Sequence, residues 1–463
     1  MTSYSASYEQ AIEFLFSRIN FERLSGTQYS ADDFKLDRMR EFLRRLGDPQ
    51  WSIPVIHVAG TKGKGSTAAY LASILTAAGY RTGLFTSPHV SAFEERMAVD
   101  GVPPTREELA ALVAGVSDVV AALDKTPGRM SPTYFEITTA LAWLYFRQRE
   151  ATIAVLEVGM GGRLDATNIC RPLVSVITTI SRDHTRQLGS RIDQIAREKA
   201  GIIKPGVPLV SGVSHPDAQA VIAEVCRQQR APLLQAGREF DFKYQPPVDR
   251  AGPSVTVRVG GITWRDVPLS LVGEHQGANA AVALAALDQL GLQGWHVAPE
   301  AILEGMRTLR WPGRIELLGR DPTVIVDAAH NWAAVGALLK TLDQSYVARR
   351  RVLIFAATRD KDFVGMLRQL LPRFDSIILT SFQNNPRNVP VAELRGVAES
   401  LSDRLLHFAS DPAAAWKLAR RLVGPPDLIC ATGSFFLAAE LRELILDERP
   451  QPVPEKVADR VPG

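Results

Sequence analysis

The sequence predicts an α/β protein of two domains, a doubly wound N-terminal domain followed by a smaller α/β domain. Short apolar runs alternate with amphipathic segments along most of the chain, a rhythm typical of parallel sheets covered by helices. A length of 463 residues exceeds what one ordinary core supports, so at least two cores are expected. The stretch Trp311-Pro312-Gly313 divides two series of runs, and its Pro and Gly predict a hinge.

The N-terminal domain is predicted for residues 1–308. Its strand-like runs are IPVIHVAG, GLFTS, TIAVLEVG, LVSVITTIS and PLVSGV, with helical patterns between several of them. Between residues 242 and 272 the pattern changes to the alternation SVTVRVGGITW, which predicts a small antiparallel β insert. A helix from about Asn279 to Leu290 is expected to follow.

The smaller domain is predicted for residues 309–449. Its runs are TVIVDAAHN, RVLIFAATRDKD, SIILTSF and DLICATGSFF, and each leads toward a helical segment, as in a Rossmann-like α/β domain. Residues 450–463, PQPVPEKVADRVPG, have too little apolar content to pack and are expected to form a flexible tail.

Composition excludes several classes of protein. Apolar residues make up 46% and charged residues 22% of the chain, as in soluble globular proteins, and a net charge of +3 argues against a dedicated nucleic-acid surface. No apolar stretch approaches the 18 or so residues of a membrane span, and Glu9 and Glu13 interrupt the start that a signal peptide needs. The separated Cys170, Cys226 and Cys430 suggest neither zinc nor disulfides. A cytoplasmic protein is expected.

The stretch HVAGTKGKGST at residues 57–67 joins a predicted strand to a predicted helix. Three glycines allow the backbone to curl and expose its N–H groups, the helix N-terminus adds about half a positive charge, and Lys64 adds a full one. This predicts a triphosphate cradle. The spacing differs from the common pattern G-x-x-x-x-G-K-[ST], because Val58 and Gly65 stand where Gly and Ser or Thr are required. A glycine-rich turn without a ligand is therefore the alternative.

Two oxygen-bearing side chains follow other predicted strands. Ser87 comes directly after the run GLFT, and Glu157 ends the run IAVLE, so both lie at the sheet edge where doubly wound proteins bind ligands. Hydroxyl and carboxylate oxygens suit Mg²⁺. The alternatives are an ordinary Ser-Pro turn and a salt bridge from Glu157 to Arg163.

Eight motifs occur in order between Gly60 and Asn331. They are GTKGKGS, FTSPHV, EVGMGGRLDATN, DHTRQLG, REKAGI, GEHQGANAA, WPGR and DAAHN. Together they resemble the folylpolyglutamate synthase and dihydrofolate synthase branch of the Mur ligase superfamily, and weaker echoes (DKD, NPR, GSFF) continue beyond them. The resemblance implies a P-loop ATPase-like N-terminal domain and an ATP-dependent ligase. Such an enzyme adds L-glutamate to dihydropteroate, to the γ-carboxylate of folate polyglutamates, or to both, through an acyl phosphate.

The resemblance also implies ATP and two Mg²⁺ sites. A monomer is expected. The resemblance assigns ATP to Gly60, Thr61, Lys62, Gly63, Lys64, Gly65, Ser66, Asn279, Arg314 and Asp327. It assigns Mg²⁺ to Ser87, Glu157 and His184, with Asp183 near the ion, and catalytic roles to Lys64, His184 and Lys199, the last as a carbamylated lysine. Residue type alone is also compatible with purely structural roles for these residues. The alternatives are a helix cap at Asn279, a surface arginine at Arg314, a turn at Asp327, a packed histidine at His184 and an unmodified surface lysine at Lys199.

The resemblance places the acceptor on two segments and one further residue. They are Thr133, Tyr134, Phe135 and Glu136, then Leu164, Asp165 and Ala166, and His330 in the second domain. Tyr134 and Phe135 can stack on a flat heterocycle, although aromatic residues at a helix start are also common in cores.

Some residues depart from the family pattern. Lys62 replaces the common Asn and adds charge near the phosphates, and Ala328 and Trp332 replace Gly and Pro, which alters the expected amino-acid pocket. Two rival functions stay open at this point: a nucleotide-binding regulator without ligase activity, and a peptidoglycan-type Mur ligase with a UDP-muramoyl acceptor. The sequence does not separate dihydrofolate synthesis from polyglutamate extension.

Overall fold

The computed structural model describes residues 7–20, 36–128, 131–183, 185–248, 252–383, 385 and 387–448. The predicted tail at 450–463 lies outside these ranges. The chain forms two compact units, Met1–Trp311 with Lys340–Tyr346, and Pro312–Leu339 with Val347–Gly463. The predicted two-domain α/β fold is confirmed. The predicted boundary at residue 308 divides the chain once, whereas residues 340–346 belong to the first unit. A sequence boundary cannot show this, because the units are defined by contacts in space and not by order along the chain.

The first unit is built on a seven-stranded sheet with the order β3-β2-β4-β1-β5-β6-β7. All neighbours are parallel except β3, which is antiparallel to β2. The central strands are buried along their whole length, as expected for apolar runs covered on both faces. The strands are β1 (Val55–Ala59), β2 (Thr82–Phe85), β3 (Met97–Val99), β4 (Ile153–Glu157), β5 (Val174–Ile177), β6 (Leu209–Ser211) and β7 (Leu233–Gln235).

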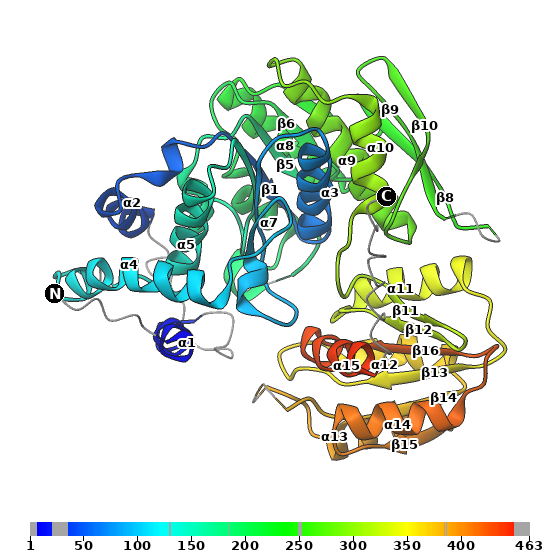
Figure 1. Ribbon diagram of the computed structural model, residues 1–463. Helices are drawn as coiled ribbons and strands as arrows, with labels where there is room; N and C mark the ends of the chain where they lie inside the picture. The colour runs from blue at the N-terminus through cyan, green and yellow to red at the C-terminus, as the bar shows by residue number, and fades with distance from the viewer. Residues whose placement is uncertain are drawn as a thin grey trace, which may run out of the picture. The chain divides into compact units, whose positions relative to one another are not determined.

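Helices cover both faces of this sheet. They are α1 (Tyr8–Phe16), α2 (Leu36–Arg45), α3 (Lys64–Ala77), α4 (Arg106–Asp124), α5 (Tyr134–Gln148), α6 (Thr185–Leu188), α7 (Ile192–Ala200), α8 (Pro216–Gln229), α9 (Glu274–Gly291) and α10 (Pro299–Thr308), with 3-10 turns η2 (Pro49–Trp51), η3 (Phe93–Arg96) and η4 (Ala166–Ile169). Alternate residues of β4 join different cores. Ala154 and Leu156 pack with α4 and α5, whereas Ile153 and Val155 pack with α3 and α9. Figure 1 shows α4 and α5 on one side of β1, and α3 and α9 on the other.

The β insert is a three-stranded antiparallel sheet of β8 (Phe240–Gln245), β9 (Ser254–Val259) and β10 (Ile262–Pro268). Alternate valines of β9 are buried and share a core with α9. The helix predicted from Asn279 begins five residues earlier, at Glu274, directly after Gly273 with φ +117°. Its first turn was missed because Glu274, His275 and Gln276 carry no apolar periodicity.

The second unit has a six-stranded sheet with the order β11-β12-β16-β13-β14-β15, in which only β11 is antiparallel to its neighbour. Its elements are β11 (Glu316–Arg320), β12 (Thr323–Val326), α11 (Trp332–Ser345), β13 (Arg351–Phe355), α12 (Phe363–Leu370), η5 (Leu371–Arg373), β14 (Ser376–Leu379), α13 (Val391–Leu401), β15 (Leu405–Phe408), α14 (Pro412–Leu422), β16 (Leu428–Thr432) and α15 (Phe435–Asp447). Strands β11, β12, β13, β14 and β16 share an apolar core with helices α14 and α15.

None of the helices in the described ranges combines the length and the apolar character that crossing a membrane requires.

Candidate active site

The glycine-rich loop connects β1, which ends at Ala59, to α3, which begins at Lys64. Two of its glycines have no room for a side chain. A Cβ at Gly60 would lie 2.0 Å from Thr178 Oγ1, and one at Gly63, where φ is +84°, would lie 2.2 Å from Asn279 Oδ1. The glycines therefore let this loop curl tightly against its neighbours.

The loop is hydrogen-bonded to the segment that follows β5. Thr61 N–H donates to Thr179 O at 2.7 Å, and Lys62 N–H donates to Thr179 Oγ1 at 2.9 Å. Thr178 Oγ1 donates to Lys62 O at 2.6 Å. These contacts fix the loop as a preformed turn. No local sequence pattern indicates them, because the partners are more than a hundred residues apart.

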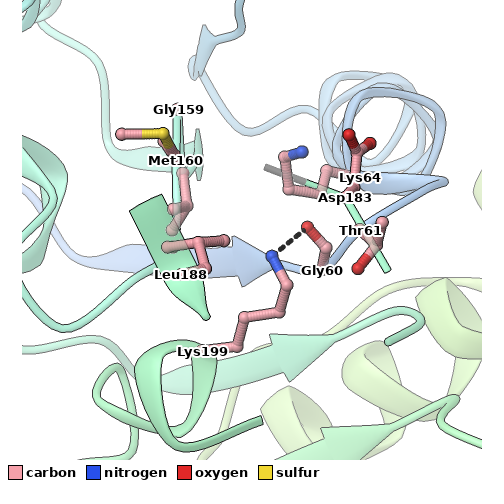
Figure 2. Close-up of a pocket in the computed structure, with 10 residues that line it drawn as sticks. Gly60, Thr61, Lys64, Gly159, Met160, Asp183, Leu188 and Lys199 are labelled. Carbon is pink, nitrogen blue, oxygen red and sulfur yellow. Dashed lines mark hydrogen bonds between the residues drawn. The ribbon is translucent and has the colours of Figure 1, made fainter. Parts of the chain in front are cut away.

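Lys199, near the end of α7, lies inside the protein with 4% of its surface exposed. Its Nζ donates to Gly60 O at 2.8 Å (Figure 2). Burial, reinforced by the positive charge of Lys64, lowers the pKa of the Lys199 ammonium to about 7. The alternative of a surface lysine is therefore wrong, and a substantial fraction of this amine is neutral near pH 7.

Glu157 ends β4 and is 4% exposed. Its Oε2 accepts the N–H of Ser87 at 3.1 Å, and its Oε1 lies 3.8 Å from Lys64 Nζ. The alternative salt bridge to Arg163 is wrong, because Arg163 pairs with Glu198 at 2.9 Å. The ends of three neighbouring strands thus bring a hydroxyl residue, a carboxylate and a lysine together.

A pocket lies beside the loop (Figure 2). It is lined by Gly60, Thr61, Lys64, Val158, Gly159, Met160, Gly161, Asp183, Leu188 and Lys199. Two lysines and a glycine-rich backbone at the start of a helix suit an anion. Within the described ranges, no group of three or more His, Cys, Asp or Glu side chains is placed to hold a metal. His184, predicted as a metal ligand, lies outside the described residues.

Asn279 lies within α9 rather than at its start, so it does not cap the helix. It is 6% exposed, and its Nδ2 donates to Gln276 Oε1 at 2.9 Å. The close approach of Asn279 to Gly63 places its amide against the loop. Its predicted contact with ATP stays a prediction.

The first acceptor segment is largely occupied by structural contacts. Tyr134 is 1% exposed, and its ring stacks on Phe16 with centroids 5.7 Å apart, so the expectation that it stacks on a substrate ring is corrected: too little of the ring is accessible. Phe135 packs against Gly159, where a Cβ would lie 2.5 Å from its Cζ.

Thr133 and Glu136 form a capping box at the start of α5. Glu136 N–H donates to Thr133 Oγ1 at 3.3 Å, and Thr133 N–H donates to Glu136 Oε2 at 2.7 Å. Glu136 also receives the Nε–H of the buried Arg38 at 2.7 Å. The motif T-x-x-E is the sequence signal for this box. Arg38 had no comparable signal.

Asp165 in the second acceptor segment is buried and begins the turn η4. Its Oδ1 accepts Thr167 N–H at 3.0 Å and Thr167 Oγ1–H at 2.5 Å, and its Oδ2 accepts Met160 N–H at 3.0 Å. Burial raises the pKa of the Asp165 carboxyl. Leu164 is half-buried and Ala166 is buried. The segment therefore orders the loop after β4, and its contact with an acceptor stays a prediction.

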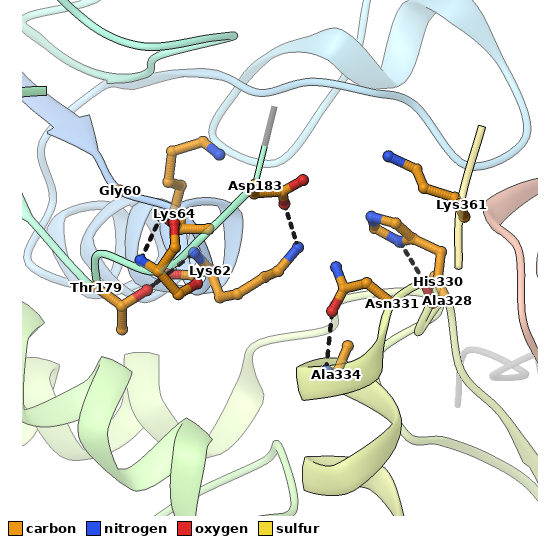
Figure 3. Close-up of polar contacts among 12 residues, drawn as sticks. Gly60, Lys62, Lys64, Thr179, Asp183, Ala328, His330, Asn331, Ala334 and Lys361 are labelled. Atoms are coloured by element: carbon orange, nitrogen blue, oxygen red, sulfur yellow. Dashed lines mark hydrogen bonds and ion pairs between the residues drawn. The ribbon is translucent and has the colours of Figure 1, made fainter. Parts of the chain in front are cut away.

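Predicted residues of the second unit gather around Phe435, which sequence reasoning missed. The guanidinium carbon of Arg314 lies 4.8 Å from the Phe435 ring centroid, and the His330 ring lies 5.3 Å from it. His330 Nδ1 is 2.9 Å from Ala328 O (Figure 3). Asp327 is buried, which raises its pKa, and it accepts the N–H groups of Ile315 and Ala329. Asp327 therefore links the segment at Ile315 to the loop that follows β12, which a simple turn residue would not do.

Comparison with known proteins agrees with this geometry. Residues 58–287 match the Mur ligase middle domain and residues 313–435 match the Mur ligase, glutamate ligase domain, so the chain is a ligase of the Mur class. "Dihydrofolate synthase/folylpolyglutamate synthase" of Bacillus subtilis is 36% identical, covering 94% of this chain and 99% of the relative. Folylpolyglutamate synthase of Lacticaseibacillus casei is 34% identical, covering 95% and 99%. The chain belongs to the folylpolyglutamate synthase/dihydrofolate synthase family.

Solved structures give the same result. Mycobacterium tuberculosis folylpolyglutamate synthase complexed with ADP is similar with a TM-score of 0.85 and 33% identity, covering 96% of this chain and 98% of that chain. E. coli FolC in complex with DHPP and ADP has a TM-score of 0.83 and 31% identity, covering 97% and 100%. The predicted family is confirmed, and the chain is an ATP-dependent ligase rather than a non-catalytic regulator.

Proposed function

We propose that this protein joins the α-amine of L-glutamate to the carboxylate of a folate, and also of dihydropteroate, with conversion of ATP to ADP and phosphate. The observation that carries this proposal is the preformed loop Gly60–Ser66, with Lys64 beside Glu157 and Ser87. The double name of the Bacillus subtilis relative supports two acceptors over one. The high coverage of folate-specific relatives speaks against a peptidoglycan acceptor.

Amide formation requires that a carboxylate oxygen become a leaving group. The acceptor carboxylate attacks the γ-phosphorus of ATP. The bond between the γ-phosphorus and the bridging oxygen breaks, ADP leaves with that oxygen, and an acyl phosphate forms. The glutamate amine then attacks the carbonyl carbon, phosphate departs, and the new amide nitrogen loses a proton. Two unit negative charges at 4 Å repel by about 4 kcal/mol at an effective dielectric of 20. Lys64 and the N-terminus of α3 offset this repulsion.

The residues also fit Mg²⁺. Ser87 and Glu157 carry oxygen atoms of the kind that Mg²⁺ prefers, and the hydrogen bond from Ser87 N–H to Glu157 Oε2 keeps the two residues together, so they would hold such an ion. We propose that Lys199, after its neutral amine adds CO₂ and loses a proton, serves a second ion as a carbamate together with His184. When bound, the two ions neutralise phosphate charge. The buried Nζ of Lys199 at the loop supports this role.

Replacing Lys64 by Ala is expected to lower kcat for ADP formation at least about 10²-fold, because it removes a charge aimed at the transferred group. The assay follows ADP and the glutamylated product with dihydropteroate, tetrahydrofolate or a UDP-muramoyl compound as acceptor. Lys243→Ala, an exposed lysine on β8, is the matched control. Wild-type turnover in Lys64→Ala would remove the loop from the mechanism, and turnover with the UDP-muramoyl acceptor alone would overturn the proposed substrate.

A further inference from the structure

Lys62 and Asp183 form an ion pair across the phosphate loop. The Lys62 Nζ lies 2.7 Å from Asp183 Oδ2, with 32% and 18% of the two side chains exposed (Figure 3). The residues are 121 positions apart in the chain, so the fold and not the local sequence brings them together.

Asp183 lines the same pocket as Lys64 and Lys199. A carboxylate at that position repels a phosphate anion, and the repulsion is only partly screened because the carboxylate is mostly removed from water. The charge of Asp183 therefore matters for the field in the pocket.

The backbone holds Lys62 in position to reach Asp183. Its carbonyl accepts the hydroxyls of Thr178 and Thr179 at 2.6 and 3.1 Å, and its N–H donates back to Thr179. Thr61 Oγ1 and the backbone of Ser181 exchange two further hydrogen bonds, of 3.1 and 3.2 Å. These hydrogen bonds fix the backbone of Lys62 and the backbone two residues before Asp183, from which the two paired side chains extend.

We propose that Lys62 is a positioning and charge-balancing residue for nucleotide binding: it cancels the negative charge of Asp183 at the phosphate pocket. This inference rests on the proposed ATP site. It predicts that the net charge of residues 62 and 183 sets the affinity for a nucleoside diphosphate when no divalent ion neutralises the phosphates. A more negative pair should bind more weakly.

The experiment is calorimetric titration with ADP in EDTA of wild type, Lys62→Asn, Asp183→Asn and the double variant, each checked by thermal melting for an intact fold. Lys62→Asn is expected to raise the Kd about tenfold, which corresponds to about 1.4 kcal/mol. Asp183→Asn should bind as tightly as wild type or more tightly, and the double variant should return to within about twofold of wild type. In about 1 M KCl, where the screening length is about 3 Å, the differences should shrink.

Lys243→Asn, which changes the net charge equally on exposed β8, should keep the wild-type Kd. The inference is overturned if Lys62→Asn binds like wild type, if the double variant is as weak as Lys62→Asn, or if Asp183→Asn binds more weakly than wild type. Failure of wild type itself to bind ADP in either EDTA or Mg²⁺ would instead overturn the proposed function, so the two failures are distinguishable.

Discussion

At the scale of single residues, His57 shows how burial fixes a protonation state. His57 lies in the middle of β1 with no exposed surface, and its Nε2 is 2.8 Å from Thr167 Oγ1. The one hydroxyl proton of Thr167 goes to Asp165, so with Asp165 ionised the hydroxyl oxygen must accept from Nε2–H. Nδ1 is then unprotonated, and among the described residues it has no hydrogen-bond partner. Burial, and secondarily the charge of Lys204, lowers the pKa of His57 to about 3.

This depressed pKa predicts an acid-sensitive stability. The unfolded chain takes up a proton on His57 below about pH 6.5, whereas the folded chain resists until about pH 3. Because the unfolded state binds more protons in this window, stability falls as the pH is lowered through it, by up to about 5 kcal/mol. His57→Leu is expected to flatten this loss in urea unfolding measured from pH 4 to about pH 8. His296→Leu, at an exposed site, should keep the wild-type slope, and equal slopes in both variants would contradict the argument.

At the scale of secondary-structure elements, α10 supports the helix that starts from the phosphate loop. Ser73 Oγ on α3 donates to Gly305 O on α10 at 2.8 Å. A Cβ at Gly305 would lie 2.5 Å from the Cα of Ile74, so the two helix backbones touch at this point. The sequence carries no local signal for this contact, because the approaching helix is more than two hundred residues away.

Gly305→Ala is expected to destabilise the protein by about 1–3 kcal/mol, since the added methyl group can be accommodated only by moving a backbone. Gly115→Ala on α4 is the matched control. Nothing lies within 4 Å of that position, so the substitution should stabilise by about 0.5–1 kcal/mol. Both values come from urea unfolding monitored by circular dichroism. A neutral or stabilising Gly305→Ala would refute the close helix contact.

At the scale of the whole molecule, each unit has an apolar core of its own. Among the described residues, the clusters around the seven-stranded sheet draw on residues between Ala11 and Met306, and a cluster of the second unit draws on residues between Leu318 and Ile445. Units with cores of their own favour more than one unfolding transition, which a single two-state analysis does not describe.

Calorimetry is expected to resolve two transitions. At an ADP concentration of 100 times Kd, the free energy of unfolding of the unit that carries Lys64 should rise by about 2.7 kcal/mol, because the ligand binds the folded form of this unit and not the unfolded chain. The other transition should move less. Lys64→Ala, which is expected to bind ADP more weakly because it lacks the positive charge of the lysine, provides the control. A single transition that shifts as a whole would show that the two units unfold together.

The sequence by itself determined the fold class, the family and the glycine-rich loop, because apolar periodicity, turn chemistry and motif order are local properties of the chain. It located strand ends at Ala59 and Glu157 to within a residue or two. It missed the start of α9 at Glu274, where polar residues carry no helical period, and it left open whether Tyr134 is buried.

Only the tertiary structure decided which of these residues meet. The pairing of Lys62 with Asp183, the burial of Lys199 beneath Gly60 and the contact of Glu157 with Ser87 join positions 70 to 139 residues apart. No local pattern encodes such pairs, since they arise when parallel strands pack and bring their carboxyl ends to one edge of the sheet. The charge states that matter at this site follow from the same packing, because removal from water shifts a pKa that the sequence alone leaves at its ordinary value.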